Sequence, residues 1–159
     1  MWRKLVTANE LGVKIFIVSV GLGEEDSVME EQYYLDNEEK SVVIVMTSGP
    51  STPNRCATPF YISAILASMD ADVSIFLTME AVRLAECGVA DKLTAMAGGK
   101  TIIEFIRDAK QAGVKLFVCK PAMPGYDLTE DIIIEEVDEI ANASKMADLI
   151  LTSDKAMFF

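Results

Sequence analysis

Histidine is absent from all 159 residues of the sequence, and its absence removes several classes of catalytic site. Ser-His-Asp and Cys-His catalysis need an imidazole, as do HExxH metal sites and the usual proton shuttle near neutral pH. The sequence also has no CxxC pair, so we expect no zinc site, and we predict neither a metal nor a cofactor. The chemistry that remains is that of a thiol, a carboxylate or a lysine.

A surplus of positive charge is missing too, because 14 Lys and Arg residues face 25 Asp and Glu residues, for a net charge of −11. Phosphates demand clusters of basic side chains, so we expect no nucleic acid as a partner and no anionic membrane surface. No apolar run approaches the ~20 residues that span a bilayer. Residues 13–23 are apolar but contain Lys14 and lack a signal-peptide cleavage site. We therefore expect a cytoplasmic protein.

The length suits one compact domain, which we place at residues 41–159. Residues 1–40 form an N-terminal extension that could be an extra helix–strand unit or a flexible tail. Its segment "ANELGVKIFIV" resembles the later "AKQAGVKLFV". The extension ends in the acidic run of residues 24–39. One weak match does not make a repeat family.

From residue 41 onward, short apolar runs alternate with helical patterns, as in α/β proteins that have a mostly parallel sheet. The clearest helix signal is a T-x-x-E capping box at Thr101 and Glu104, with Gly113 beyond the helix end. We predict strands at residues 42–46, 72–79, 114–119 and 155–159. We predict helices at about residues 59–70, 80–87, 101–112, 129–137 and 141–149.

The "AGGKT" stretch of residues 97–101 ends like a phosphate-binding P-loop but lacks the rest of the motif. A P-loop needs a glycine where this sequence has Thr94, and it needs a preceding strand, whereas "VADKLTAMA" has a helical pattern. We therefore interpret "AGGKT" as a glycine link into a capped helix.

Three cysteines, an odd number at wide spacings, do not suggest a disulfide framework. Cys119 ends a predicted strand, with Lys120 beside it, at the sheet edge where reactive groups of α/β proteins gather. Cys56 lies at a helix start next to Arg55, an environment that lowers the pKa of a thiol. Each could equally be a buried packing residue. Cys87 lies beside Glu86 and is interpreted as incidental.

Several segments together resemble the DsrE/DsrF-like family of small sulfur-relay proteins. They are "VVIVMTSGPSTPNRCATPFYISAILASMDADVSIFLTMEAV", "GVKLFVCKPAM", "LTEDIIIEEVDEI" and "ILTSDKAMFF". The resemblance covers residues 41–159 and implies a flavodoxin-like, three-layer α/β subunit that assembles into oligomers. It departs from the family at Glu80-Ala81-Val82, where an acidic-Gly-Val turn is common.

The resemblance implies that Cys119 carries sulfane sulfur, as a persulfide or a thiosulfonate, and passes it to a TusA-like partner. We expect Arg55 and Lys120 to stabilise the thiolate and an anionic donor, Cys56 to be a possible second thiol, and Ser48 and Glu80 to line the pocket. The enzyme class would be a sulfurtransferase, and the partner chain a second copy in a homo-oligomer. The alternative is a non-catalytic module of the same fold that binds a small anion or a protein and has structural thiols.

Overall fold

The computed structural model describes residues 5–8, 14–17 and 40–159, and the chain divides into two units at residue 38. In the first unit, β1 (Leu5–Ala8) pairs antiparallel with β2 (Lys14–Ile17). Residues 1–4, 9–13 and 18–39 of the predicted extension, including the acidic run 24–39, lie outside the described residues. None of the described helices is long and apolar enough to cross a membrane.

The second unit is a five-stranded sheet in the order β6-β5-β4-β3-β7, and every neighbouring pair is parallel. The strands are β3 (Ser41–Met46), β4 (Asp72–Leu77), β5 (Lys115–Cys119), β6 (Glu139–Ala141) and β7 (Lys155–Phe158). The helices are α1 (Ala57–Ala67), α2 (Ile102–Gln111) and α3 (Ala143–Thr152). Short 3-10 helices connect them: η1 (Pro53–Arg55), η2 (Met79–Ala85), η3 (Ala90–Lys92), η4 (Lys120–Tyr126) and η5 (Glu130–Ile132).

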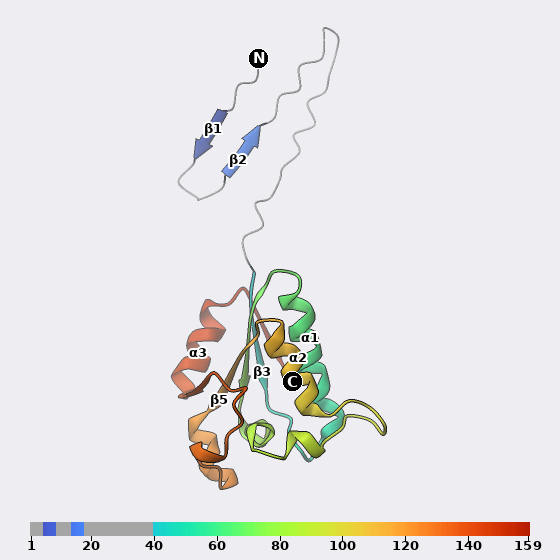
Figure 1. Ribbon diagram of the computed structural model, residues 1–159. Coiled ribbons are helices and arrows are strands. Elements are labelled where there is room, and N and C mark those ends of the chain that lie inside the picture. Colours follow the sequence, from blue (N-terminus) through green and yellow to red (C-terminus); the bar gives the residue numbers. More distant parts are fainter. Residues whose placement is uncertain (1–4, 9–13, 18–39) are drawn as a thin grey trace. The chain divides into compact units, whose positions relative to one another are not determined.

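The fold has three layers, with α1 and α2 on one face of the sheet and α3 on the other (Figure 1). The chain steps in one direction from β3 through β4 and β5 to β6, and then crosses back past β3 to form β7. Parallel crossovers are right-handed, so reversing the direction of travel moves the connecting helix to the opposite face. The predicted three-layer α/β fold with a parallel sheet is confirmed.

The residue types in the sequence explain why β3, α2 and the turn into β5 form. The β-branched run of β3 is buried on both faces, as expected for an inner strand of a parallel sheet. The predicted capping box starts α2, since the Glu104 carboxylate accepts hydrogen bonds from the N–H and the hydroxyl of Thr101 at 2.7 and 2.8 Å. Gly113, at φ +94°, then turns the chain into β5.

Three predicted helices were wrong. Residues 80–87 form the 3-10 helix η2, and the "VADKLTAMA" pattern yields only the short η3. Residues 129–137 contain only the three-residue η5, and β6, which was not predicted, follows. β6 is an edge strand whose position depends on pairing with β5, so tertiary contacts overrode the local helical pattern.

Candidate functional site

Cys119 is the last residue of β5 and lies at the carboxyl edge of the sheet, the lower edge in Figure 1. β4 and β6 flank β5 on its two sides, with Val118 opposite Leu77 and Cys119 opposite Ala141. η4 begins at the next residue and packs against η2, which follows β4. Cys119 is only 5% exposed. The thiol is therefore positioned as predicted, but it is closed off in this conformation.

The amino-terminal end of α3 also meets this edge. Ala141, the register partner of Cys119, is followed by Asn142, whose side chain does not cap the first turn of α3. First-turn N–H groups carry partial positive charge, which favours a neighbouring thiolate. The sequence predicted helix starts at this edge and a helix from about residue 141, but it did not predict β6, the strand that aligns the start of α3 with Cys119. The only signal available was the Asn142 N-cap before a helical pattern.

Cys56 lies in a different environment. It is completely buried, and its Sγ lies 3.3 Å from the carbonyl oxygen of Gly49 and 3.5 Å from that of Thr52, to which the thiol can donate. Burial and the Glu80 carboxylate raise the pKa of Cys56 to about 11, against a lowering effect of Arg55. The predicted lowering of this pKa was wrong, because burial outweighs the helix terminus and the guanidinium.

The two cysteines lie on opposite faces of the sheet. Lys145 of α3 places its Nζ 5.8 Å from the centre of the Phe117 ring, so Phe117 faces α3. Side chains two residues apart on a strand share a face, and Cys119 is therefore on the α3 side as well. Cys56 immediately precedes α1 on the other side, beyond β4. A second-thiol role for Cys56 stays a prediction, and its contacts argue for packing.

The predicted cations do not contact the thiol. Lys120 is exposed, and its Nζ pairs with the Glu130 carboxylate at 2.8 Å. Arg55 is exposed in η1. Their roles at Cys119 stay predictions. Cys87, to which we assigned no role, is the exposed cysteine, and its backbone N–H donates to the carbonyl of Ile132 at 2.8 Å.

Ser48 and Glu80 belong to a tight joint between the loops that follow β3 and β4. Ser48 is buried, and its carbonyl oxygen lies 3.8 Å from the Cys56 sulfur. The Glu80 carboxylate accepts a hydrogen bond from the Ser51 N–H at 2.9 Å and another from the Ser51 hydroxyl. A Cβ on Gly49 would lie 2.5 Å from the carbonyl oxygen of Glu80, so this approach requires glycine. Their role as walls of a pocket stays a prediction.

The chain itself closes the usual crevice for ligands. In open α/β sheets, small molecules bind where the strand order reverses direction, which here lies between the carboxyl ends of β3 and β7. The Thr47 N–H and hydroxyl both donate to the Phe159 carbonyl at that place, at 2.7 and 2.8 Å. No group of three or more metal-ligating side chains occurs among the described residues. Two hydrogen bonds thus join the chain at the place where a ligand of this fold class commonly binds.

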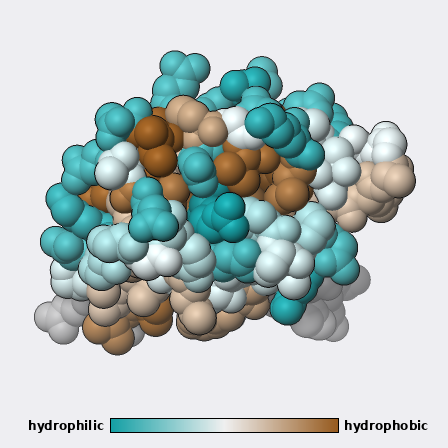
Figure 2. Space-filling model, turned by 90° about the horizontal axis from the view of Figure 1, so that it is seen from below, coloured by the Kyte–Doolittle hydropathy of each residue, from teal (hydrophilic) through white to brown (hydrophobic). Residues whose placement is uncertain are grey.

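Seen from below, the carboxyl edge shows polar side chains that separate patches of apolar ones (Figure 2). A groove with a cavity volume of about 300 Å³ lies elsewhere, on the outer side of α1 and α2. Its lining is mostly apolar and consists of Tyr61, Ala64, Ile65, Ser68, Met69, Phe105 and Asp108.

The model of the DsrE/DsrF-like family matches residues 40–159 of the chain. Among solved structures, the YchN protein of E. coli is similar at 21% identity and a TM-score of 0.64, over 76% of this chain and 99% of YchN. MTH1491 of Methanobacterium thermoautotrophicum is similar at 10% identity and a TM-score of 0.54, over 77% of this chain and 100% of its own. BT1422 of Bacteroides thetaiotaomicron is similar at 13% identity and a TM-score of 0.54, over 76% of this chain and 95% of its own. At these identities the likeness shows the fold alone. No curated protein matches the sequence.

Proposed function

The chain belongs to the DsrE/DsrF-like family through residues 40–159, and on that basis we propose that it is a sulfur-relay protein that carries sulfane sulfur on Cys119. The observation that carries the proposal is the place of this cysteine, at the carboxyl end of an inner parallel strand beside the start of α3. All three cysteines of the sequence lie within residues 40–159. Neither Cys56 nor Cys87 lies at the end of an inner strand, as Cys119 does.

The proposed reaction has two exchanges. The Cys119 thiolate attacks the outer sulfur of an anionic donor such as thiosulfate, the S–S bond of the donor breaks, and sulfite leaves with the electron pair. The resulting persulfide is then attacked at its terminal sulfur by the thiolate of an acceptor, which regenerates the Cys119 thiolate. No external oxidant or reductant takes part. A TusA-like protein is the acceptor that we propose.

The first turn of α3 and Arg55 have supporting roles in this proposal. The first turn of α3 stabilises the thiolate and the departing charge, and Arg55, which is exposed, helps to attract an anionic donor. Cys56, with its raised pKa, does not act as a nucleophile in this scheme. The three cysteines are free thiols in the structure, as a reducing cytoplasm would keep them, and this is where we place the protein.

We also propose that the subunit forms a homo-oligomer, supported by apolar side chains that remain exposed. Tyr61 of α1 and Met69, which follows the end of α1, are 57% and 72% exposed. On the other side of the sheet, Leu151 and Phe158 are 84% and 65% exposed. Large exposed apolar side chains of this kind mark interaction surfaces. Sedimentation velocity should show an assembly larger than the 17.4 kDa monomer.

Loading experiments test the sulfur-carrier proposal. After incubation with thiosulfate or polysulfide, intact-mass analysis should show one added sulfur on the wild type, on Cys56→Ala and on Cys87→Ser. Cys119→Ala should remain unmodified. Equal loading of Cys119→Ala, or no loading of the wild type by any of the donors, would reject the proposal.

The burial of Cys119 favours one rival function, a non-catalytic module that binds a small anion or a protein. In that case Cys119 fills space, as buried cysteines commonly do. The rival predicts that Cys119→Ala lowers stability without changing any sulfur loading. The same set of four proteins therefore decides between the two functions.

A further inference from the structure

The feature that the proposed function leaves unexplained is the low exposure of the reactive thiol. Both faces of the sheet are covered by helices, and β4 and β6 flank Cys119 on either side. The end of β5 itself points out at the carboxyl edge, where neither a flanking strand nor a helix layer lies across it. η4 starts there, directly after Cys119. The chain that follows Cys119, residues 120–131, leaves the strand at this edge, and we call it the cover segment.

The cover segment packs against its neighbours but forms few hydrogen bonds with them. Among the described residues, no hydrogen bond joins residues 121–131 to anything outside residues 120–132. Its backbone bonds are internal, such as that from the Asp127 N–H to the Pro124 carbonyl at 3.3 Å and that from the Leu128 N–H to the Met123 carbonyl at 3.1 Å. The chain beyond it is tied down, because the carbonyl of Ile132 accepts from the N–H of Cys87.

Two buried side chains and one ion pair hold the segment in place. Met123 and Leu128 are 3% and 6% exposed and belong to the core, whereas most other side chains of the segment are exposed. Lys120 and Glu130, at opposite ends, form an ion pair of 2.8 Å whose partners are 58% and 62% exposed. A compact loop with close ends and its own internal contacts has the construction of an Ω-loop. Such a unit can open locally without unfolding the sheet.

We propose that the cover segment opens as a unit to admit sulfur donors and acceptors to Cys119, with Met123 and Leu128 as its anchors and Lys120–Glu130 as its latch. The inference rests on the proposed function for the purpose of the opening, although the opening itself is a property of the fold. It also gives Lys120 a new role. Lys120 holds the cover closed, instead of stabilising the thiolate.

The two roles of Lys120 predict opposite results in one alkylation experiment. The rate constant for neutral iodoacetamide at Cys119 is measured at a fixed pH by peptide mass in a Cys87→Ser background. If Lys120 is the latch, Lys120→Met raises the rate about two- to fivefold, the range for loss of an exposed ion pair. If Lys120 stabilises the thiolate, the same variant reacts more slowly. Lys100→Met is the matched control, since Lys100 forms an ion pair of 2.8 Å with Asp108 at similar exposure.

Removing an anchor should act more strongly than removing the latch. Met123→Ala loses buried contacts of the segment, and we expect Cys119 to react at least about tenfold faster. The wild type should react faster in 0.5 M salt, whereas Lys120→Met should respond less. A slower reaction of Lys120→Met, or an unchanged rate in Met123→Ala, would overturn the proposal.

Hydrogen exchange keeps the test valid if Met123→Ala unfolds. In the wild-type protein, amides of the cover segment should exchange through an opening that barely depends on urea, while amides of β3 exchange through global unfolding. If both sets exchange only by global unfolding, the segment does not open as a unit and the proposal fails. None of these readouts needs sulfur transfer. A chain that opens but takes up no sulfur would reject the proposed function and leave this inference standing.

Discussion

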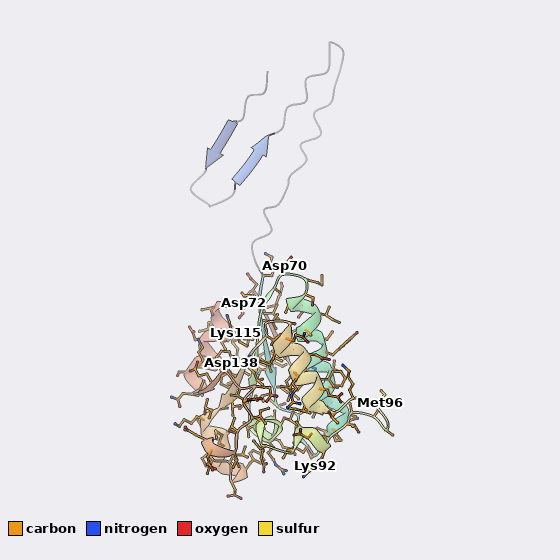
Figure 3. The ribbon with its side chains drawn as sticks, in the orientation of Figure 1. Asp70, Asp72, Lys92, Met96, Lys115 and Asp138 are labelled. Carbon is orange, nitrogen blue, oxygen red and sulfur yellow. The ribbon has the colours of Figure 1, made fainter. Side chains whose placement is uncertain are left out.

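The two edges of the sheet are built in opposite ways. At the amino edge, the upper one in Figure 3, charged side chains link different elements, and Asp72, Lys115 and Asp138 lie there. At the carboxyl edge, the ion pair beside Cys119 links two ends of one segment, Lys120 and Glu130. The difference indicates that ion pairs tie separate elements together at the amino edge, whereas the ion pair beside Cys119 does not tie the cover segment to its neighbours.

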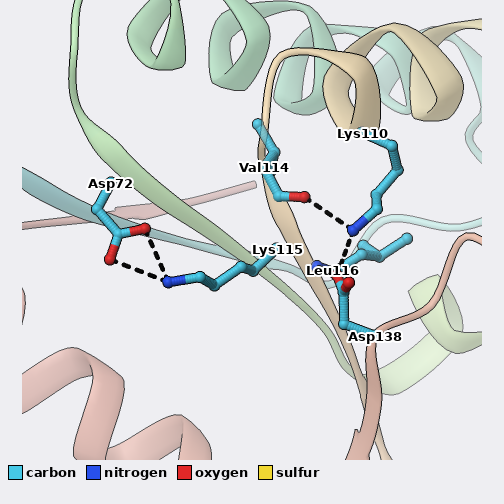
Figure 4. Close-up of polar contacts among 6 residues, drawn as sticks. All are labelled: Asp72, Lys110, Val114, Lys115, Leu116 and Asp138. Carbon is cyan, nitrogen blue, oxygen red and sulfur yellow. Dashed lines mark hydrogen bonds and ion pairs between the residues drawn. The ribbon is translucent and has the colours of Figure 1, made fainter.

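Asp138 is at the centre of the polar contacts of the amino edge (Figure 4). Its carboxylate accepts hydrogen bonds from the Leu116 N–H, at 2.6 Å, and from the Lys110 ammonium, which also donates to the Val114 carbonyl at 3.1 Å. One carboxylate thus joins the end of α2, the start of β5 and the approach to β6. Asp154 does the same for β3 and β7, since it accepts from the N–H and the hydroxyl of Ser41 at 2.8 and 3.0 Å.

The largest effect should come from the tight joint between the loops that follow β3 and β4 at the carboxyl edge. In Gly49→Ala the new Cβ would meet the backbone of Glu80 at 2.5 Å, so one of the two loops must move. We expect the free energy of unfolding to fall by about 1–3 kcal/mol, the range for overpacking. Urea denaturation measures it, with Gly125→Ala, where a Cβ meets nothing, as the matched control. Equal stability of the two variants would show that this edge has no tight joint.

Removing the Asp138 contacts at the amino edge should have the next largest effect on the free energy of unfolding. Asp138→Asn removes the charge that Leu116 and Lys110 both contact, and we expect a loss of about 1–2 kcal/mol, since the carboxylate is partly exposed. Sulfur loading of Cys119 should not change. If the loading fell in proportion to the stability, the two edges would not be independent.

Relieving strain should stabilise the carboxyl edge. Met79, where η2 begins, has φ +51°, a left-handed conformation that costs a side chain other than glycine roughly 1–2 kcal/mol. Because glycine is also freer in the unfolded chain, Met79→Gly should raise the free energy of unfolding by only about 0.5–1 kcal/mol. Thermal denaturation would detect it, and a fall in stability would show that the exposed Met79 side chain makes contacts that outweigh the strain.

The smallest effect is the response to acid, which should belong to the amino edge. Burial opposes ionisation of Asp138, but its hydrogen bonds from Lys110 and Leu116 outweigh this and lower its pKa from 3.8. Hydrogen bonds from Ser41 lower the pKa of Asp154. Both carboxylates therefore stabilise the fold above pH of about 4, and this contribution is lost as pH falls through their lowered pKa values. Urea midpoints of an Asp138→Asn, Asp154→Asn double variant should depend less on pH between pH 4 and pH 2.5, and an unchanged slope would contradict the assignment.

The sequence revealed features that depend on neighbouring residues and missed those that depend on distant ones. The Thr101–Glu104 capping box spans four residues and was predicted in full, and so was the strand that ends at Cys119. β6 was missed because its three residues form a strand only through pairing with β5. The same reason hid the contacts of Asp138, whose partner Lys110 lies 28 residues away.

The candidate site shows the same limit. The strand pattern predicted the place of Cys119, but its exposure depends on how residues 120–131 pack. The sequence neighbour Lys120 suggested a cation for the thiolate, whereas the ammonium pairs with Glu130, ten residues further along. Arg55 stands next to Cys56 in sequence, yet burial dominates the pKa of that thiol. A basic residue next to a cysteine in the sequence therefore did not predict the electrostatic environment of the thiol.

The strand order determines when the sheet can be completed as the chain is synthesised. β3 is the first strand of the sheet to be synthesised, and one of its two neighbours, β7, is paired with it from more than 110 residues further along, with Ile44 opposite Met157. Pairing over such a distance raises the contact order and slows folding. Until residues 155–158 have left the ribosome, one edge of β3 stays open to other nascent chains, so this apolar strand is where chaperones would be needed first.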